Sequence, residues 1–536
     1  MKNLSNLQRY VFILPILIIT VSWIYLFISS GIFKVGFNYF LDDHSILLAH
    51  SKSLSFHDIF FTPFATLVSP EQKLRFRPLY DVFIGFLAKV YGLRPLVWYL
   101  SSCIIAITTS LLFYLIGRLQ NFSYLESILF TGLIVLGPQA STYARFGTPE
   151  TTSTFLIALA FFVASLKVNQ KHLQLFLNSL FLLFSIAASL NKEACILMLP
   201  ALAFFKVWYI SWKEHKSFKK AFLQKKITVL FMIAIFLLLL AYIKLTNVGG
   251  PGYAGIDNNT FYITSYINLF QANKSAFGLA LITNFMCGII YFQKICHSKF
   301  KLNANVLKFY VFCGLIIIPQ MILYSKSGLT THYLLPASIG ISWLTIYPLN
   351  TITKKRNLYS KVIAFILTII IVIAIGNNFM WTKQYFIYTT KRIGDIEEMI
   401  QDVSSCTGNN SSLVIFANPY TNYEMIFAFK VISDKIFNNN QVFLATYGTQ
   451  NSHFITNTIN EKGWHFLNPE ALENIYNNQA ITSLTKENLE EIKGIVLANA
   501  REFERDFTQL KIDGLKLDLF TSKYYENLNI RFYCRL

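Results

Sequence analysis

The 536-residue sequence is 54% hydrophobic and only 14% charged, with a mean hydropathy of +0.44. Soluble domains carry about 25% charged residues, so this composition excludes an ordinary soluble protein and indicates a chain embedded largely in a membrane. The net charge of +19 does not indicate nucleic-acid binding, because the basic residues lie in short loops between apolar segments. Among the seven cysteines there is no CxxC pair and no Cys/His cluster at zinc spacing. We expect no cofactor, and a divalent metal is an alternative that no motif indicates.

Apolar segments long enough to cross a bilayer begin near the N-terminus. The first, about residues 10–30, follows a basic start but is longer than the apolar part of a signal peptide, so we expect an uncleaved span. A span needs about 20 mostly apolar residues. We expect eleven spans, at about 10–30, 96–116, 124–141, 151–167, 173–190, 194–211, 227–245, 276–292, 307–324, 332–349 and 360–380.

The basic residues of the connecting loops predict the orientation of these spans. If the N-terminus is cytoplasmic, the richest basic stretches all fall in inside loops, as the positive-inside rule requires. Those stretches contain Lys213, Lys216, Lys219, Lys220, Lys225, Lys226, Lys294, Lys299, Lys301, Lys354, Lys355 and Arg356. The first large loop, 31–95, then lies outside, and so does the chain after residue 380. We therefore expect a membrane domain over 1–380 and an extracytoplasmic domain over 381–536.

The C-terminal segment has the pattern of a small α/β domain. The stretch "SSLVIFANPYTNYEMIFAFKVIS" predicts a buried strand, a turn at Asn418–Pro419 and a helix, and "QVFLATYG" and "KGIVLANA" predict further strands. Cys406 and Cys534 are its only cysteines. In an oxidising compartment we expect them to form a disulfide, and the alternative is two unrelated thiols.

The first loop begins with two adjacent carboxylates, Asp42 and Asp43, in "NYFLDDHSILLAH". One interpretation is that Asp42 caps the short helix that follows. The other is that one carboxylate accepts a proton from an acceptor hydroxyl or orients it. Neighbouring helical residues point about 100° apart, so one acid can cap while the other faces a cavity.

Three further outer segments carry charge. Arg77 precedes the proline that begins an expected outer helix, "PLYDVFIGFLAKVYG", and is a candidate for binding phosphate. The turn "ARFGTPE" carries Arg145 and Glu150, and the turn "LNKEACILMLP" carries Lys192 and Glu193. A local ion pair could close each turn. Because all three segments share one side of the membrane, a common cationic pocket for phosphate is the functional alternative.

The order of these segments resembles the GT-C superfamily of membrane glycosyltransferases, in particular the protein O-mannosyltransferase and aminoarabinose-transferase group. The likeness covers about residues 10–380. It consists of the acidic pair Asp42–Asp43, the helix start in "RPLYDVFIGFLAKVYGLRPLVWYL", the two turns, and "HYLLPA" with His332 and Tyr333. The sequence departs from the group in having Asp-Asp for Asp-Glu, Arg-Pro for Pro-Pro and His332 for a late arginine. The resemblance implies a polytopic α-helical membrane protein with a GT-C-like fold.

The resemblance also implies an enzyme that transfers a sugar from a polyprenyl-phosphate-linked donor to an acceptor hydroxyl, with inversion. Asp42 or Asp43 would activate the acceptor hydroxyl of an envelope lipid, glycan or protein. The expected donor-phosphate ligands are Arg77, Arg145 and Lys192, and the expected substrate contacts are Glu150, Glu193, His332 and Tyr333. We expect a bacterial inner-membrane protein with its site facing the periplasm. The alternatives are a lipid-linked polysaccharide ligase or polymerase, and a non-enzymatic transporter or flippase, which would place such charges near the midplane of the membrane.

Overall fold

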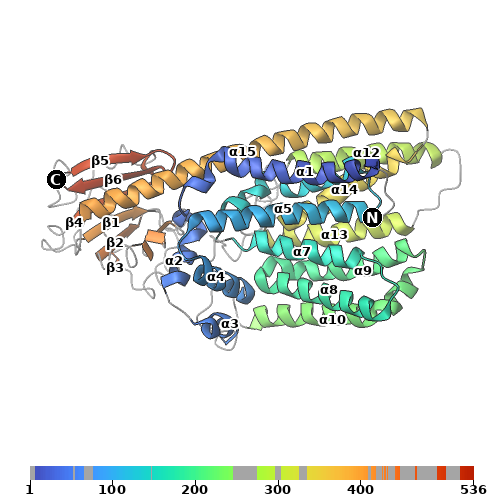
Figure 1. The fold of residues 1–536 in the computed structure, drawn as a ribbon, viewed down its shortest axis with the longest axis horizontal. Coiled ribbons are helices and arrows are strands. Elements are labelled where there is room, and N and C mark those ends of the chain that lie inside the picture. The colour runs from blue at the N-terminus through green and yellow to red at the C-terminus, as the bar shows by residue number, and fades with distance from the viewer. Residues whose placement is uncertain are drawn as a thin grey trace.

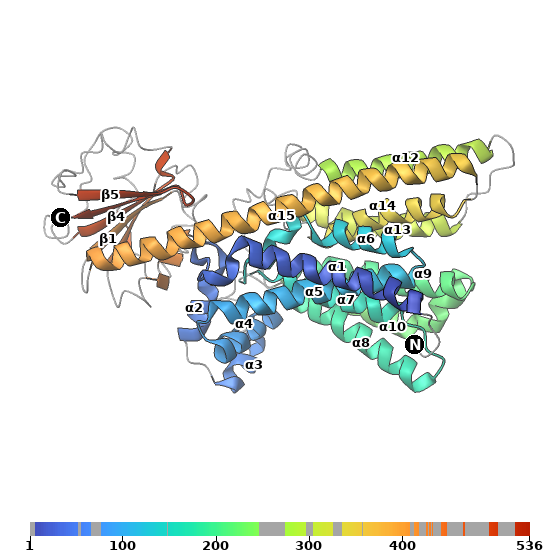
Figure 2. The same ribbon diagram turned by 45° about the horizontal axis from the view of Figure 1, so that its top comes forward.

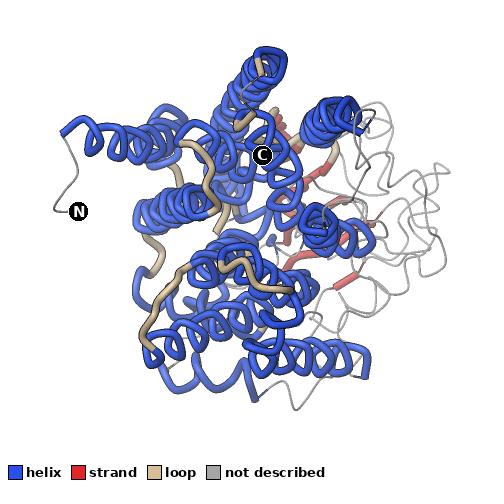
Figure 3. Tube along the Cα trace, turned by 90° about the vertical axis from the view of Figure 1, so that its right-hand side faces the viewer, coloured by secondary structure: helices blue, strands red, loops and turns tan. Residues whose placement is uncertain are grey.

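The computed structural model is an elongated molecule with a helical bundle and a β-sheet at one end (Figure 1). Helix α1 begins at the end of the bundle opposite the sheet, and Figure 3 looks onto that end. The structure describes residues 6–51, 55–65, 77–146, 148–245, 274–295, 304–324, 335–355, 357–407, 412–417, 425–426, 428–429, 431–432, 441–446, 465–466, 492–501 and 520–535.

Every segment expected as a span falls on a helix of the bundle. The helices are α1 (Asn6–Ser30), α5 (Pro95–Leu119), α6 (Tyr124–Val135), α7 (Glu150–Ser165), α8 (Lys171–Asn191), α9 (Leu199–Lys213), α10 (Phe218–Leu245), α12 (Lys274–Ile295), α13 (Ala304–Tyr324), α14 (Leu335–Thr353) and α15 (Leu358–Thr407). In the described chain, seven helices are long and apolar enough to cross a membrane: α1, α5, α8, α9 with the turn before it, α10, α13 and α15. Shorter apolar helices are α6, α7 and most of α12.

The helices differ in how much of their surface is buried inside the bundle. Helix α9 with its preceding turn is 83% buried inside the bundle, whereas α10 is only 17% buried. The side chains that α10 exposes are apolar, and they include Leu230, Leu237 and Leu238. A helix that is apolar on all sides and covered on one is stable only against lipid.

Aromatic side chains fill the centre of the bundle. The ring of Trp343 on α14 lies 5.1 Å from that of Phe161 on α7 and 5.0 Å from that of Phe312 on α13. Helices α13 and α14 approach closely at Gly340, where an added Cβ would lie 2.8 Å from Ile317. Edge and tilted ring packing of this kind fixes how these helices meet.

The loops at the sheet end of the bundle form short helices of their own. The first loop contains η1 (Ile32–Lys34), η2 (Tyr39–Asp43), α2 (His44–Ser51), α3 (Phe56–Ala65) and α4 (Pro78–Tyr91). Two more turns at this end are the 3₁₀ helices η4 (Pro138–Ala144) and η5 (Glu193–Met198). The span expected over 124–141 ends earlier, at Val135, because Gly137 adopts a positive φ of 96° and Pro138 starts η4.

The sheet has six strands in the order β3-β2-β1-β4-β6-β5. They are β1 (Ser412–Ala417), β2 (Gln441–Thr446), β3 (His465–Phe466), β4 (Ile492–Ala498), β5 (Phe520–Tyr525) and β6 (Ile530–Arg535). Strand β1 pairs in parallel with β2 and β4, and β6 pairs antiparallel with β4 and β5. The three strands expected in this segment are confirmed as β1, β2 and β4. The turn expected at Asn418–Pro419 lies outside the described residues.

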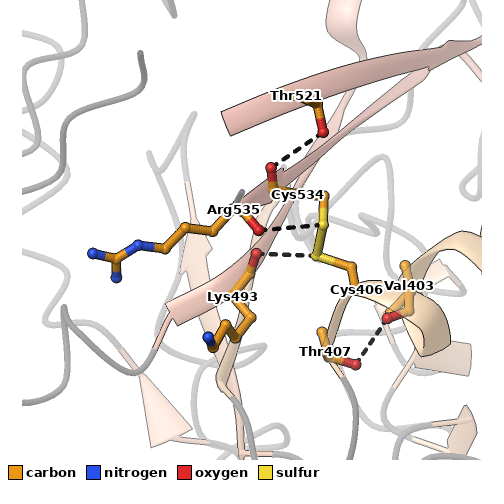
Figure 4. Close-up of a disulfide and its surroundings, with 7 residues drawn as sticks. All are labelled: Val403, Cys406, Thr407, Lys493, Thr521, Cys534 and Arg535. Carbon is orange, nitrogen blue, oxygen red and sulfur yellow. Dashed lines mark hydrogen bonds between the residues drawn. A yellow bond between two sulfur atoms is a disulfide. The ribbon is translucent and has the colours of Figure 1, made fainter. Parts of the chain in front are cut away.

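Helix α15 joins the bundle to the sheet (Figure 2). It has 50 residues and runs through the boundary expected at residue 380. Its second half stays helical because Ile393, Ile396, Met399 and Val403 form one buried stripe at helical spacing. At its end, Cys406 forms a disulfide with Cys534 of β6, with Cα atoms 5.7 Å apart (Figure 4). The expected pairing of these cysteines is confirmed.

The first loop packs between the bundle and the sheet unit. Phe40 of η2 and Leu47 of α2 share a buried cluster with Ile396 and Met399 of α15. The ring of Phe40 also lies 4.8 Å from that of Phe429, a residue of the C-terminal segment. The loop that carries the acid pair is therefore held on both sides.

Candidate active site

The acid pair lies in η2, at the junction just described. The backbone breaks helical geometry at Leu41 (φ −111°, ψ −108°), and α2 begins directly after Asp43. Asp43 is fully buried, and its two carboxylate oxygens accept hydrogen bonds from the backbone N–H groups of Asn38 and Phe146, each at 2.9 Å. Asp43 thus ties the first loop to the turn "ARFGTPE". The side chain of Asp42 lies outside the described residues, so its expected capping and catalytic roles remain predictions.

A third carboxylate, Glu397 of α15, lies beside this loop. It accepts a hydrogen bond from the backbone N–H of Gly36, and an added Cβ at Gly36 would lie 2.2 Å from its Oε1. The hydroxyl of Tyr99 donates to the carbonyl oxygen of Gly36 at 3.0 Å. Burial raises the pKa of Tyr39, and the nearby Asp43 and Glu397 carboxylates raise it further. Two carboxylates and two neutral phenols therefore surround the start of the loop.

Asn38, in the same loop, is fully buried and has no hydrogen-bond partner for its side-chain amide within the part of the chain that the structure describes. A buried amide without partners costs free energy, because water satisfies it in the unfolded chain. Neither Asn38 nor Glu397 was expected from the sequence. Asn38 precedes the acid pair without any motif, and Glu397 lies more than 350 residues from it in the chain.

The two charged turns are joined by a buried ion pair. The ammonium of Lys192 lies 2.7 Å from the carboxylate of Glu150, and both side chains are about 5% exposed. Asn191 strengthens this junction by donating to the carbonyl oxygen of Pro149 at 2.9 Å and to the hydroxyl of Ser153 at 2.7 Å. The end of α8 is therefore fixed against the start of α7.

Arg77 extends this junction to the first loop. It lies at the start of α4 and is buried, and its Nε and Nη2 donate to the two carboxylate oxygens of Glu193 at 2.7 and 2.9 Å. Burial alone lowers the pKa of Arg77, but the attraction of Glu193 and Glu150 outweighs it and the pKa lies above its ordinary range. Both ion pairs connect different elements. The sequence alone had suggested either a local pair in each turn or a shared pocket.

Arg145 belongs to the same turn as Glu150 but contacts α15. Its Nε donates to the hydroxyl of Tyr385 at 3.1 Å, and its guanidinium lies 5.8 Å from the centre of that ring. Tyr385 in turn stacks on Trp381, with ring centres 5.3 Å apart. The next residue in the chain, Phe146, donates its backbone N–H to Asp43. Arg145 is therefore adjacent in sequence to the residue that contacts the acid pair.

The structure thus links most of the expected site residues in one connected region. The contacts run from Asp43 to the turn with Arg145 and Glu150, then to Lys192 and Glu193, and from Glu193 to Arg77. His332 and Tyr333 lie outside the described residues. Among the described residues, no group of three or more His, Cys, Asp or Glu side chains is placed to hold a metal ion.

Neither a protein-family model nor a curated protein sequence matches the chain. The chain is similar to solved structures of ArnT from Cupriavidus metallidurans. The structure bound to undecaprenyl phosphate has 11% identity and a TM-score of 0.46, and the match covers 98% of each chain. The apo structure has 9% identity and a TM-score of 0.43, and the match covers 90% of this chain and 94% of that one. Both TM-scores lie below 0.5. The matches identify neither the sugar nor the acceptor.

Proposed function

We propose that this protein is a membrane glycosyltransferase that moves a sugar from a polyprenyl-phosphate-linked donor to an acceptor hydroxyl. The observation that carries the proposal is the connected region in which the acid-pair loop meets three basic side chains at one end of an apolar bundle. Phosphate on a lipid carrier needs cations at the membrane boundary, and an acceptor hydroxyl needs a carboxylate nearby.

Arg77, Lys192 and Arg145 bind the donor phosphate in this proposal. Glu193 accepts from two nitrogens of Arg77. A guanidinium carries five N–H donors, so Arg77 can donate to a phosphate as well. The glutamates also hold Arg77 and Lys192 in fixed positions before the lipid arrives, which lowers the entropic cost of binding a phosphate. Tyr385 positions Arg145 in the same way.

Asp42 is the proposed base and Asp43 the residue that positions it. The acceptor hydroxyl gives its proton to Asp42 while its oxygen attacks the anomeric carbon. The bond from that carbon to the phosphate oxygen breaks, and the polyprenyl phosphate leaves with the electron pair. One displacement of this kind inverts the anomeric centre. Asp43 already accepts two backbone N–H bonds, so it fixes the loop and leaves proton transfer to its neighbour.

We further propose that the site faces the outside of the bacterial inner membrane and that eleven helices span it. Loop charge supports this orientation, with the loop 31–95 and the segment 381–536 extracytoplasmic. The Cys406–Cys534 disulfide supports it independently, because disulfides persist in oxidising compartments. Nucleotide sugars are cytoplasmic, so an external site requires a lipid-carried donor. The acceptor is an envelope lipid, a glycan or a protein.

The proposal is tested by mass spectrometry of envelope lipids, glycans and proteins from cells with and without this chain. Wild-type protein should add a mass that corresponds to one sugar. Asp42→Asn should lower the rate of transfer by about 10²–10⁴-fold while the protein still inserts, because an amide cannot accept the proton.

The matched control is Asp58→Asn, which changes a half-exposed aspartate of the same loop. Its carboxylate accepts hydrogen bonds from the backbone N–H and the hydroxyl of Ser55 and lies 3.8 Å from the ring of His57. This variant should transfer sugar at the wild-type rate. Near-wild-type transfer by Asp42→Asn would end the base assignment. If wild-type protein adds no sugar to any class of acceptor, the transferase proposal itself fails.

A further inference from the structure

A basic cavity of about 30 Å³ lies between α7, α8, α9 and α10. Its lining contains four lysines and one carboxylate: Lys167, Lys206, Lys213, Lys225 and Glu214. The cavity lies at the C-terminal end of α7, a helix of 16 residues whose other end carries Glu150 of the candidate site. At 1.5 Å per residue the two regions are about 24 Å apart along that helix, so the cavity is a separate site.

Two of these lysines are buried to an unusual degree. Lys206 is 4% exposed and Lys225 is 5% exposed. Lys206 Nζ lies 3.5 Å from the carbonyl oxygen of Ala164, and Lys225 Nζ lies 3.5 Å from Asn178 Oδ1. Both lysines line the same cavity, so their like charges repel each other.

The one carboxylate of the lining does not neutralise them. Glu214 pairs with Lys216 at 2.5 Å, and within the described residues no ion pair joins a carboxylate to Lys206 or Lys225. Buried charges are normally paired, because an unpaired ammonium in a low-dielectric site is strongly destabilising. Four positive charges against one negative charge leave a formal excess of three in a cavity with room for roughly two water-sized groups.

We propose that this cavity binds the phosphate of an anionic phospholipid headgroup. A phosphodiester supplies the missing negative charge and accepts several hydrogen bonds from lysine ammonium groups. Basic pockets between membrane helices are suited to anionic headgroups for this reason. The proposal goes beyond the transfer reaction and does not depend on it.

The surfaces beside the cavity favour a lipid over a soluble phosphate. The helices that contribute Asn178 and Lys225, α8 and α10, carry large exposed apolar side chains close to those residues. These side chains are Leu173, Leu175, Phe176, Leu223, Ile227 and Leu230. Acyl chains can lie along this apolar surface while oxygens of the phosphate reach the lysines of the cavity, so both parts of one molecule have a place to bind.

The test is binding of dioctanoyl phosphatidylglycerol to the purified full-length protein, measured by native mass spectrometry in detergent. Wild-type protein should bind this lipid more tightly than dioctanoyl phosphatidylcholine. Lys225→Gln and Lys206→Gln should each raise its Kd by about fivefold or more, the effect of one lysine close to an anionic lipid. If Lys206→Gln does not fold, Lys213→Gln at the cavity wall replaces it.

The matched control is Lys226→Gln, which removes the same charge from the next residue of α10. Lys226 is exposed and does not line the cavity, so this variant should bind like the wild type. Equal binding of both lipids, or equal loss in the Lys225 and Lys226 variants, would overturn the proposal. If inorganic phosphate displaces the lipid stoichiometrically at a similar concentration, the cavity is a soluble-phosphate site and the lipid assignment is wrong.

Discussion

At the scale of single residues, Asp43 shows how one buried carboxylate can fix the arrangement of a candidate site. It accepts the backbone N–H of Asn38, five residues before it, and that of Phe146, more than 100 residues after it. The first bond closes η2 and the second attaches η2 to the Arg145 turn. Hydrogen bonds to a charged acceptor contribute more than neutral ones, and their donors are unsatisfied if the acceptor is lost.

Asp43→Asn should therefore destabilise the folded protein by about 1–3 kcal/mol. The asparagine keeps one accepting oxygen, but its NH₂ group would face a backbone N–H that now has no acceptor. The free energy of unfolding, measured by chemical denaturation in detergent, checks this. Asp58→Asn is the reference and should lose less, because its half-exposed side chain keeps an oxygen that accepts from Ser55. An Asp43→Asn protein as stable as the wild type would contradict the positioning role.

Sequence reasoning reached some site residues and could not reach others, for a physical reason. Charged residues beside apolar helices are rare because burying charge near lipid costs free energy, so they can be recognised from the sequence as candidate site residues. These residues are Lys192, Glu193, Glu150 and Arg77. Their pairing across elements was not predictable, because it depends on how α4, α7 and α8 pack. Glu397 was missed because it lies on an ordinary charged helical segment, and only the course of α15 brings it to Gly36.

At the scale of elements, α15 is the feature that unites the molecule. Hydropathy predicts the first part of α15 as a span, but it does not predict where the helix ends. The helix continues because an apolar stripe follows the membrane-like segment. Ile396, Met399 and Val403 of this stripe pack with residues of the sheet. Hydropathy did not predict the η4 and η5 turns, because their apolar residues continue the pattern of the neighbouring spans.

The disulfide should stabilise this arrangement strongly, because it joins residues 128 apart in sequence. Closing a loop of this length contributes roughly 5 kcal/mol in the chain-entropy model. Cys406→Ala should therefore lose about that much from the free energy of unfolding of the sheet unit. Denaturant titration with a probe on the sheet, such as protection of its strands from proteolysis, measures the loss.

Reduction supplies the control for this prediction. Dithiothreitol should lower the stability of the wild-type sheet unit to that of Cys406→Ala, and it should leave Cys406→Ala itself unchanged. If the wild-type protein shows two reactive thiols at these positions without reductant, the stabilising role of the bond is wrong.

At the scale of the whole molecule, the two ends of the bundle carry opposite arrangements of charge. The end next to the sheet pairs its cations with carboxylates, as Arg77 does with Glu193 and Lys192 with Glu150. The opposite end collects lysines with few acids, as in the cavity lined by Lys206 and Lys225. Paired charges can orient a substrate, whereas unpaired lysines favour anionic headgroups and a cytoplasmic location.

This asymmetry predicts the topology. Alkaline phosphatase folds only in an oxidising compartment, so its activity reports the side on which it lies. Fused after Leu536, which keeps α15 and the sheet intact, it should be active in bacterial cells. Inserted after His215, between α9 and α10 and beside the lysine cavity, it should be inactive. A cytoplasmic reporter such as green fluorescent protein should give the reverse pattern at the same two positions. Activity at His215 with none at Leu536 would invert the chain, place the acid pair where nucleotide sugars are available, and remove the reason for a lipid-carried donor.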